Sequence, residues 1–255
     1  MKKPRPTSFF DVYAHEYDFL TDAAGREATH RKEVQAIIEA FRPRSVLDAG
    51  CATGLTARLF AENRIATVGL DRSKAILDIA RSKHNKYNTI LRFIVGDFEK
   101  LPQALHGQFD LVVCLANSIA GVGTIGGLRR SLENFHRALK PGGWLVLQLL
   151  NYSAIREGEV LPIRATEHKG IVYERFSERK GRRLFLYVTR LDTRAKPPGL
   201  EVFRHEFDNF SPAEVSRGLR RAGFGHLRRY GDLYLREKFA KLSRDLVITA
   251  RRAPR

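Results

Sequence analysis

The sequence has only two cysteines and no long apolar run, and each absence excludes a class of protein. Cys51 and Cys114 are too few for a disulfide scaffold, and neither has histidine or cysteine neighbours at metal-ligand spacing. The longest apolar stretch, residues 145–150, is interrupted by Gln148 and is far shorter than the roughly 20 residues that cross a bilayer. The basic residues 1–6 are not followed by the apolar segment of a secretory signal. We therefore expect a reduced, cytoplasmic protein without a metal and without a membrane span.

Acidic residues are also scarce, because 28 Asp and Glu stand against 45 Lys and Arg in 255 residues, which gives a formal charge of +17. The excess is +6 in residues 1–150 (21 basic, 15 acidic) and +11 in residues 151–255 (24 basic, 13 acidic). Such a surface can attract RNA or a phosphorylated partner. The basic runs are short and scattered, which favours an ordinary solvated surface. The 43% of apolar residues excludes a disordered chain.

Short apolar runs alternate with helical patterns in the middle of the chain. Strands are expected at 45–48, 66–71, 91–95, 109–114 and 144–149, helices at 55–61, 74–82 and 128–139, and a Lys-Pro-Gly-Gly turn at 140–143. Buried strands that alternate with helices predict a parallel sheet covered on both faces. The fold class is therefore α/β, with a doubly wound sheet.

The segments on either side of this core have other patterns. Aromatic residues near the N-terminus recur at helical spacing, whereas the region after residue 150 has alternating strand patterns at 170–177, 183–192 and 200–207. A capped helix and a last strand follow. The predicted units are a helical lid at 1–43, a cofactor-binding core at 44–150, an antiparallel β cap at 151–210 and a C-terminal segment at 211–255 that completes the core.

A glycine turn follows the first predicted strand. Gly50 and Gly54 allow the backbone to approach a ligand at the carboxyl end of that strand, where open α/β sheets bind ligands. Asp48 beside the turn would repel a pyrophosphate but suits a ligand with a cationic ammonium group.

Two further carboxylates end the next two strands. Asp71 stands where a carboxylate can hold both ribose hydroxyls of an adenosine, and Asp97 and Phe98 can meet the adenine. Three carboxylates at three successive strand ends predict a nucleoside site.

These residues resemble class I S-adenosylmethionine-dependent methyltransferases. The V-L-D-A-G-C-A-T-G stretch at 46–54 is similar to their D-x-G-x-G-x-G loop, with Ala52 in place of the middle glycine; its methyl group should be tolerated if its φ is negative. F-D-L-V-V-C-L-A-N-S at 109–118 and N-Y at 151–152 resemble glycine N-methyltransferase and the aminosugar N-methyltransferases. The resemblance covers roughly residues 10–250. It implies a mostly parallel seven-stranded sheet, an inserted antiparallel cap over the acceptor site, and S-adenosylmethionine as cofactor.

The motifs and the resemblance together give two sets of site residues. The predicted cofactor site consists of Tyr17, Arg26, Asp48, Gly50, Cys51, Ala52, Gly54, Asp71, Arg72, Asp97, Phe98 and Leu115. The predicted acceptor site consists of Tyr13, Asn117, Asn151, Tyr152 and Arg204, and Asn117 and Tyr17 are expected to be the catalytic residues that orient the acceptor.

Two departures from these relatives limit what the resemblance implies. Gly121 stands where they carry a histidine, and Leu150 stands where an arginine binds the glycine carboxylate, so glycine is not the expected acceptor. We expect methyl transfer to an amine of a small polar molecule. An RNA acceptor and a non-catalytic cofactor-binding module stay open as alternatives, as does the oligomeric state.

The proton acceptor is also open. Tyr13, His15, Tyr17 and His205 are candidates, although an acceptor that is already unprotonated would need none, and we expect no histidine to be essential. In the strand at 200–207, His205 and Arg204 point to opposite faces, and the sequence does not say which face meets the site.

Overall fold

The computed structural model describes residues 9–152 and 156–254, so the parts of the predicted lid, cap and C-terminal segment at 1–8, 153–155 and 255 lie outside the described residues. The strands are β1 (Ser45–Ala49), β2 (Ala66–Asp71), β3 (Leu91–Val95), β4 (Phe109–Cys114), β5 (Leu139–Leu150), β6 (Val160–His168), β7 (Ile171–Lys180), β8 (Arg183–Asp192), β9 (Gly199–Asp208), β10 (Phe224–Tyr230) and β11 (Asp245–Arg252). The α-helices are α1 (Phe9–Val12), α2 (Tyr17–Leu20), α3 (Ala23–Phe41), α4 (Leu55–Glu62), α5 (Lys74–Lys83), α6 (Ile125–Ala138) and α7 (Pro212–Arg221). The 3-10 helices are η1 (Ala14–Glu16), η2 (Asn85–Tyr87), η3 (Phe98–Lys100), η4 (Gln103–Leu105) and η5 (Ser118–Val122).

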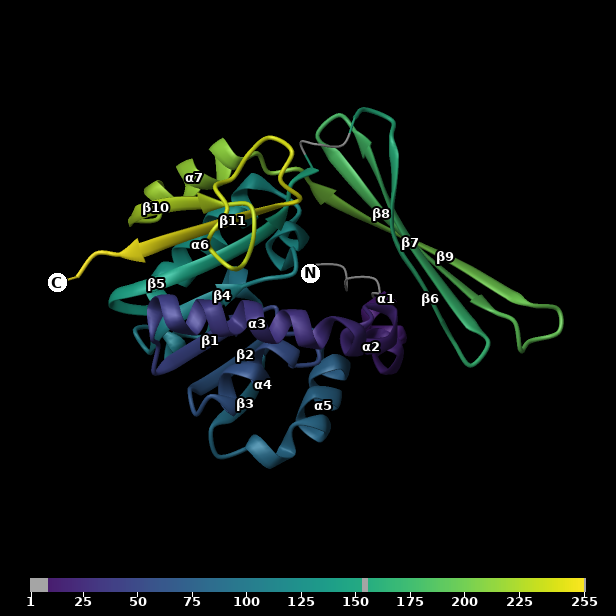
Figure 1. Cartoon of the computed structure of the whole chain (residues 1–255), viewed down its shortest axis with the longest axis horizontal. Coiled ribbons are helices and arrows are strands. Elements are labelled where there is room, and N and C mark those ends of the chain that lie inside the picture. The colour runs from purple at the N-terminus through teal and green to yellow at the C-terminus, as the bar shows by residue number, and fades with distance from the viewer. Residues whose placement is uncertain (1–8, 153–155, 255) are drawn as a thin grey trace, which may run out of the picture.

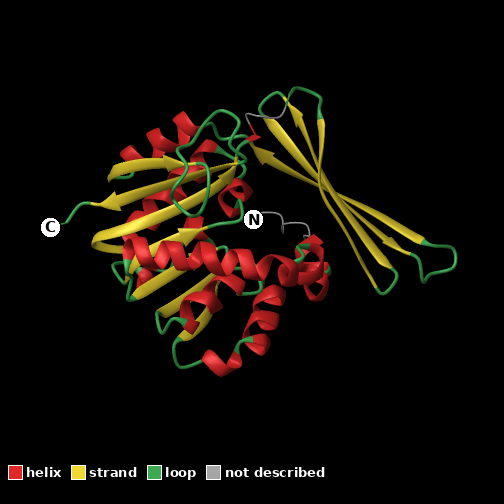
Figure 2. Cartoon of the chain, in the orientation of Figure 1, coloured by secondary structure: helices red, strands yellow, loops and turns green. Residues whose placement is uncertain are grey.

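Seven strands form the main sheet, in the order β10-β11-β5-β4-β1-β2-β3. Strands β1 to β5 pair in parallel, and β11 runs antiparallel to both of its neighbours. Neighbouring residues of one strand face opposite layers: Val46 packs with α3 and α4, and Leu47 packs with α6 and α7. Helices thus cover both faces, as Figures 1 and 2 show, and the predicted α/β doubly wound fold is confirmed.

One predicted turn is wrong. The Lys-Pro-Gly-Gly segment at 140–143 belongs to β5, which begins at Leu139 opposite Phe109. The register of the pair shifts between Phe109 and Leu111, and Gly142 has a φ of +81°. An irregular strand start can thus hold Pro and Gly residues whose composition indicates a turn.

Strands β6 to β9 form the second sheet, in which each strand is antiparallel to the next. The sequence predicted three of these strands and missed β6. In Figure 1 this sheet is a separate layer beside the core, with α1 and α2 next to it. Leu20 of α2 packs against Ile171, Tyr173 and Val188 of the sheet, so the N-terminal helices and the cap share a small apolar core.

In the part of the chain that the structure describes, no helix is both long enough and apolar enough to span a bilayer.

Candidate functional site

The glycine turn lies at the carboxyl ends of β1 and β2. The N–H groups of Gly50 and Cys51 donate to the carbonyl of Leu70, with N···O distances of 2.8 Å and 3.1 Å. Gly50 has a φ of +83°, and a Cβ added there would lie 2.7 Å from Ser118. Gly54 has a φ of +84°, and a Cβ there would lie 2.6 Å from the Phe93 ring. Both glycines are therefore required by backbone conformation and by space.

Ala52 lies within the same turn at a φ of +48°. The condition under which its methyl group should be tolerated, a negative φ, is not met. A non-glycine residue in the left-handed region costs about 1–2 kcal/mol. The Ala52 N–H donates to Oδ2 of Asp71 at 3.0 Å, and this charge-assisted hydrogen bond opposes the strain.

Asp71 connects the glycine turn to the start of α5. Its Oδ1 accepts a hydrogen bond from the Ser73 N–H at 3.0 Å, while Oδ2 holds Ala52. Burial raises the pKa of Asp71, and the two backbone N–H groups oppose that shift. Arg72, the next residue, is exposed. A carboxylate with fixed geometry thus stands at the end of β2.

Asp48 is buried behind the turn, with 2% of its surface exposed. Within the described residues its Oδ2 has no hydrogen-bond partner. Burial, together with the charge of Asp71, raises the pKa of Asp48 to about 7. A buried carboxylate oxygen without a donor is costly, so this position suits a ligand that brings a cation or an N–H group.

The third strand end completes this edge of the sheet. Asp97 caps η3 by accepting a hydrogen bond from the Glu99 N–H at 2.9 Å. The Phe98 ring packs against Phe135 with a centroid distance of 5.7 Å, and it lies 3.7 Å from the Cβ position built on Gly50. Leu115, which follows β4, is buried. The structure therefore brings the strand-end residues predicted for the cofactor together around one turn.

Both cysteines are poor nucleophiles. Cys51 and Cys114 are buried, and burial raises the pKa of each thiol. Among the residues that the structure describes, no group of three or more His, Cys, Asp or Glu side chains could hold a metal ion.

The N-terminal helices are fastened to the glycine turn. Asp18 of α2 accepts a hydrogen bond from the Thr53 hydroxyl and pairs with Lys83 of α5. Asp11 accepts from the hydroxyl of Ser73. Sequence reasoning missed these contacts, because they join residues 35 to 65 positions apart and leave no local pattern.

Tyr17 and Arg26 were predicted to belong to the cofactor site. Burial, and after it the charge of Asp71, raise the pKa of Tyr17 to about 12, so its hydroxyl keeps its proton at neutral pH. Arg26 is exposed on α3 and donates to the carbonyl of Thr21 at 2.7 Å. Tyr17 therefore lies close to the Asp71 carboxylate, whereas Arg26 is exposed to solvent and binds the lid backbone.

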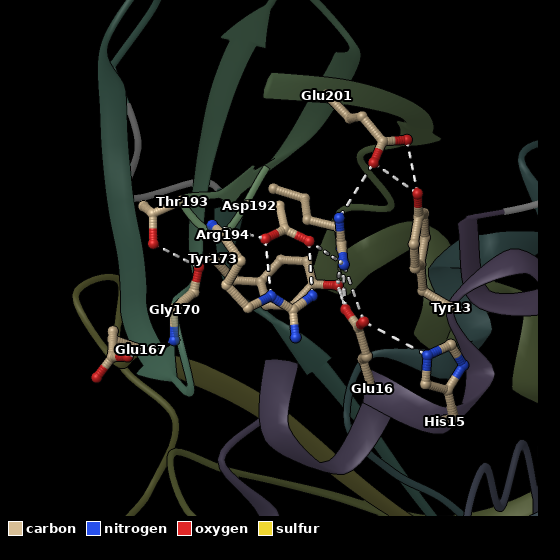
Figure 3. A network of polar contacts seen from close by, with 11 residues as sticks. Tyr13, His15, Glu16, Glu167, Gly170, Tyr173, Asp192, Thr193, Arg194 and Glu201 are labelled. Carbon is tan, nitrogen blue, oxygen red and sulfur yellow. Dashed lines mark hydrogen bonds and ion pairs between the residues drawn. The ribbon is translucent and has the colours of Figure 1, made fainter. Parts of the chain in front are cut away.

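A network of charged groups joins the lid to the cap (Figure 3). The Glu16 carboxylate receives two hydrogen bonds from the Arg190 guanidinium, both at 3.0 Å, and a third from the Tyr173 hydroxyl. Burial alone would raise the pKa of Glu16, but these donors outweigh it and the pKa falls below its usual value. Tyr13 donates to Glu201 of β9, with contacts of 2.6 Å and 2.7 Å to its two carboxylate oxygens. The Tyr13 hydroxyl, predicted to bind the acceptor, thus binds the cap.

Asn117 and Tyr152 lie together. Asn117 has a φ of +64°; its Nδ2 donates to the Tyr152 hydroxyl at 2.9 Å, and its Oδ1 accepts from the Leu150 N–H at 3.1 Å. Tyr152 is buried, and its ring packs with Leu184 and Phe207 of the cap. The end of β4, the end of β5 and the cap meet at this pair.

Two predicted acceptor residues lie elsewhere. Asn151 donates to the carbonyls of Lys241 and Ser243, and so fixes the loop that precedes β11. Arg204 is exposed, and its guanidinium lies 5.1 Å from the centre of the Phe185 ring. The structure does not bring these two side chains to the Asn117–Tyr152 pair.

A cavity of about 760 Å³ lies between the lid, α4, the end of α5 and β6. Its lining includes Asp18, Thr53, Lys83 and Arg164, but not the carboxylates at the strand ends. Asp18 pairs with Lys83, and Arg164 pairs with Asp22, so much of the charge in this cavity is already balanced.

Comparison with known proteins gives one family match and several relatives. Residues 46–143 match the family described as "Methyltransferase domain". Glycine/sarcosine/dimethylglycine N-methyltransferase of Actinopolyspora halophila is 32% identical over 57% of this chain and 27% of its own length. dTDP-4-amino-2,3,4,6-tetradeoxy-D-glucose N,N-dimethyltransferase of Saccharopolyspora spinosa is 30% identical over 53% of each chain. The chain spans about half or less of the length of the first curated relatives it matches.

Solved structures support the same fold. An amino pentose methyltransferase from Micromonospora echinaspora, solved with S-adenosylmethionine bound, aligns with a TM-score of 0.67 and 23% identity over 98% of this chain and 100% of the other. The predicted resemblance to class I methyltransferases is confirmed.

Proposed function

We propose that this chain transfers a methyl group from S-adenosylmethionine to an amine nitrogen of a small polar acceptor. Its match to a methyltransferase domain over residues 46–143 and its fold support this proposal. The observation that carries this proposal is the glycine turn with two carboxylates beside it, the buried Asp48 and the partly buried Asp71. The Oδ2 of Asp48, which has no hydrogen-bond partner among the described residues, fits a ligand that brings a cationic group.

Each residue around the turn is proposed to bind one part of the cofactor. Asp71 would accept the ribose hydroxyls, and Asp48 would pair with the ammonium group of the methionine part. Asp97 and Phe98 would meet the adenine. The other proposed contacts to the cofactor come from Tyr17, Arg26, Cys51, Ala52, Arg72 and Leu115. When bound, S-adenosylmethionine supplies a methyl group that its sulfonium already activates.

The chain's own contribution is mainly to position the acceptor. The lid at 1–43 and the cap at 151–210 would enclose the acceptor against the core at 44–150, which 211–255 completes, and would exclude water. Asn117 has one Nδ2 hydrogen left beyond its bond to Tyr152, and Tyr17 keeps its hydroxyl proton, so each can donate to the acceptor. Holding two reactants in line can lower a barrier by about 7–11 kcal/mol. Of the other predicted acceptor residues, the Tyr13 hydroxyl binds Glu201 of the cap, Asn151 binds the loop before β11, and Arg204 is exposed.

The relatives favour an amine as acceptor. The names of both curated relatives describe N-methylation, one of glycine and its methylated derivatives and one of an amino sugar nucleotide. Leu150 stands where an arginine would hold the carboxylate of glycine, so an amino sugar fits this chain better than glycine does.

The test is methyl transfer from isotopically labelled S-adenosylmethionine, followed by mass spectrometry. The panel contains glycine, sarcosine, dTDP-4-amino-2,3,4,6-tetradeoxy-D-glucose, simple phenols and total RNA. We expect label on an amine. Label only on phenols would overturn the choice of nitrogen, and cofactor binding without transfer to any member would favour a non-catalytic module.

RNA is the second candidate acceptor, because the C-terminal 105 residues hold an excess of 11 basic charges. Binding through six or more phosphates loses about a thousandfold in affinity between 50 and 200 mM salt. Label on RNA together with that salt dependence would replace the small-molecule proposal.

A further inference from the structure

His205 lies on the inner face of β9. Exposure alternates along this strand: Val202, Arg204 and Glu206 are exposed, whereas the residues between them are partly covered. Since side chains of a strand alternate between its faces, His205 shares its face with Glu201, which binds Tyr13 of the lid. The structure thus decides what the sequence left open, because His205 points inward and Arg204 points to solvent.

A chain of contacts connects His205 to the proposed acceptor site. Its ring stacks on Phe207, with centroids 6.4 Å apart. Phe207 packs against Tyr152, and the Tyr152 hydroxyl accepts the hydrogen bond from Asn117. Strand β9 also packs against η5, which begins directly after Asn117.

The positive charge of Arg72 acts on His205, and Arg72 directly follows Asp71 at the end of β2. His205 is therefore linked by charge to the end of β2 and by packing through Phe207 to the pair proposed to orient the acceptor.

The other candidate proton acceptors fit this task poorly. Burial raises the pKa of Tyr13 to about 12, as it does for Tyr17 and Tyr152, so all three hydroxyls keep their protons at neutral pH. The His15 side chain is 71% exposed on the lid and lies 3.4 Å from Glu16.

Burial, and after it the positive charge of Arg72, lower the pKa of His205, so the ring is neutral at physiological pH. The other ionisable groups on the elements around it include Tyr152, Tyr173, Arg175 and the Arg190–Glu201 pair, together with Tyr13, Glu16 and Tyr17 of the lid. Of these, Tyr13, Glu16, Tyr173, Arg190 and Glu201 are paired with one another.

We propose that His205 is the catalytic residue that accepts a proton from the ammonium form of the acceptor. This inference rests on the proposed function. The N–H bond of the ammonium breaks, its proton moves to the imidazole, and its electron pair stays on the nitrogen. That pair forms the N–CH₃ bond while the electrons of the C–S bond stay on sulfur. The imidazolium then releases its proton to solvent.

The first test compares His205→Gln with the unaltered protein, using the amine of the panel that reacts fastest. At pH 7.5 we expect kcat to fall by about a hundredfold or more, the range of general acid–base catalysis, with the affinity for S-adenosylmethionine changed less than threefold. The rate of the variant should rise about tenfold per pH unit as the amine loses its own proton, so the gap narrows at high pH. Imidazole should partly restore His205→Ala.

Two histidine variants serve as matched controls. His226 is exposed on β10 and His15 is exposed on the lid, so His226→Gln and His15→Ala should each keep kcat within about tenfold. A kcat within tenfold for His205→Gln, or a rate ratio that does not depend on pH, would overturn the proposal.

The second test does not depend on turnover. In protein labelled with ¹⁵N at histidine, the His205 signals are those missing from His205→Gln. We expect this ring to titrate below the usual pH of a histidine, and its signals to shift when S-adenosylhomocysteine and the amine are added. A ring that titrates at the usual pH of a histidine, and whose signals do not shift when either ligand is added, would refute the proposal. If the ring behaves as expected but no amine is methylated, the proposed function fails instead.

Discussion

The carboxyl edge of the core is held together by residues that are close in sequence, whereas the contact between lid and cap joins residues that are far apart in sequence. At the core edge, Asp71 binds the N–H of Ala52, 19 residues away, and that of Ser73, two residues away. At the lid–cap contact, Glu16 binds Arg190 across 174 residues. The first region is determined by strand ends and turns, and the second by how the helical lid packs on the antiparallel cap sheet. Substitutions at the contact between lid and cap should therefore leave the strand ends proposed to bind the cofactor unchanged. The following experiments test whether the two regions are independent.

The largest expected effect is on the lid–cap contact. Arg190→Met leaves the Glu16 carboxylate, whose side chain is only 13% exposed, without its guanidinium, and breaking a buried pair costs up to about 3–5 kcal/mol. Urea denaturation should show this loss in the free energy of unfolding. If the two regions are separate, the affinity for S-adenosylmethionine in the folded variant stays within about threefold.

The matched control is Arg194→Met. Arg194, in the turn after β8, pairs with Asp192 at the end of that strand, but its side chain is 55% exposed, so the loss of stability should be much smaller. Equal losses in the two variants would show that the Glu16 pair is no stronger than a surface pair.

The next effect in size is on the core edge. Asp71→Ala removes the acceptor proposed for the ribose and both anchors of the turn, and hydrogen bonds to a charged group contribute about 1.5–3 kcal/mol. Calorimetry should show at least about a tenfold loss of affinity for S-adenosylmethionine. Asp71→Asn, which keeps one acceptor oxygen, should lose less. Unchanged affinity in folded Asp71→Ala would remove Asp71 from the cofactor site.

Asp48 makes cofactor affinity depend on pH. Its pKa is raised to about 7 in the free protein, and only the ionised carboxylate pairs with an ammonium group. Affinity should therefore fall by up to about tenfold per unit as pH drops below 7, and should level off above it. Titration calorimetry in two buffers should detect proton release on binding near pH 6. Asp48→Asn should remove this dependence, and a dependence that persists would point to another group.

The same carboxyl affects stability with a definite sign. Because the folded pKa of Asp48 lies above its unfolded value, the folded state binds the extra proton between about pH 4 and pH 7. The contribution of this group to stability is thus full at acidic pH and is lost as pH rises through 7. Against the unaltered protein, Asp48→Asn should become relatively more stable as pH increases over that window.

The smallest effect concerns Ala52. Glycine adopts a positive φ without strain, so Ala52→Gly should recover about 1 kcal/mol of folding free energy. Thermal unfolding measures this gain. Ala61→Gly in α4 is the control and should lower stability, since glycine in a helix costs about 1 kcal/mol. A loss of stability in Ala52→Gly would mean that the turn is not strained.

Most of the core was predictable because its signals are local. Strand ends, glycine spacing and the carboxylates of β1, β2 and β3 lie in short segments that each carry their own pattern. Strand β6 was missed because Pro162 interrupts it and Val160 and Leu161 are exposed, so no burial pattern marks the strand. In β9 the sequence revealed which residues share a face, but only packing against the lid decides which face is inside.

The hydrogen bond between Asp18 and Thr53 would make cofactor exchange depend on movement of the lid. Thr53 belongs to the turn proposed to bind the cofactor, and Asp18 also holds Lys83 at the end of α5. If the cofactor binds at this turn, the two contacts of Asp18 would have to open before spent cofactor leaves and fresh cofactor enters. Lid opening would then set the rate of product release when the chemistry is fast.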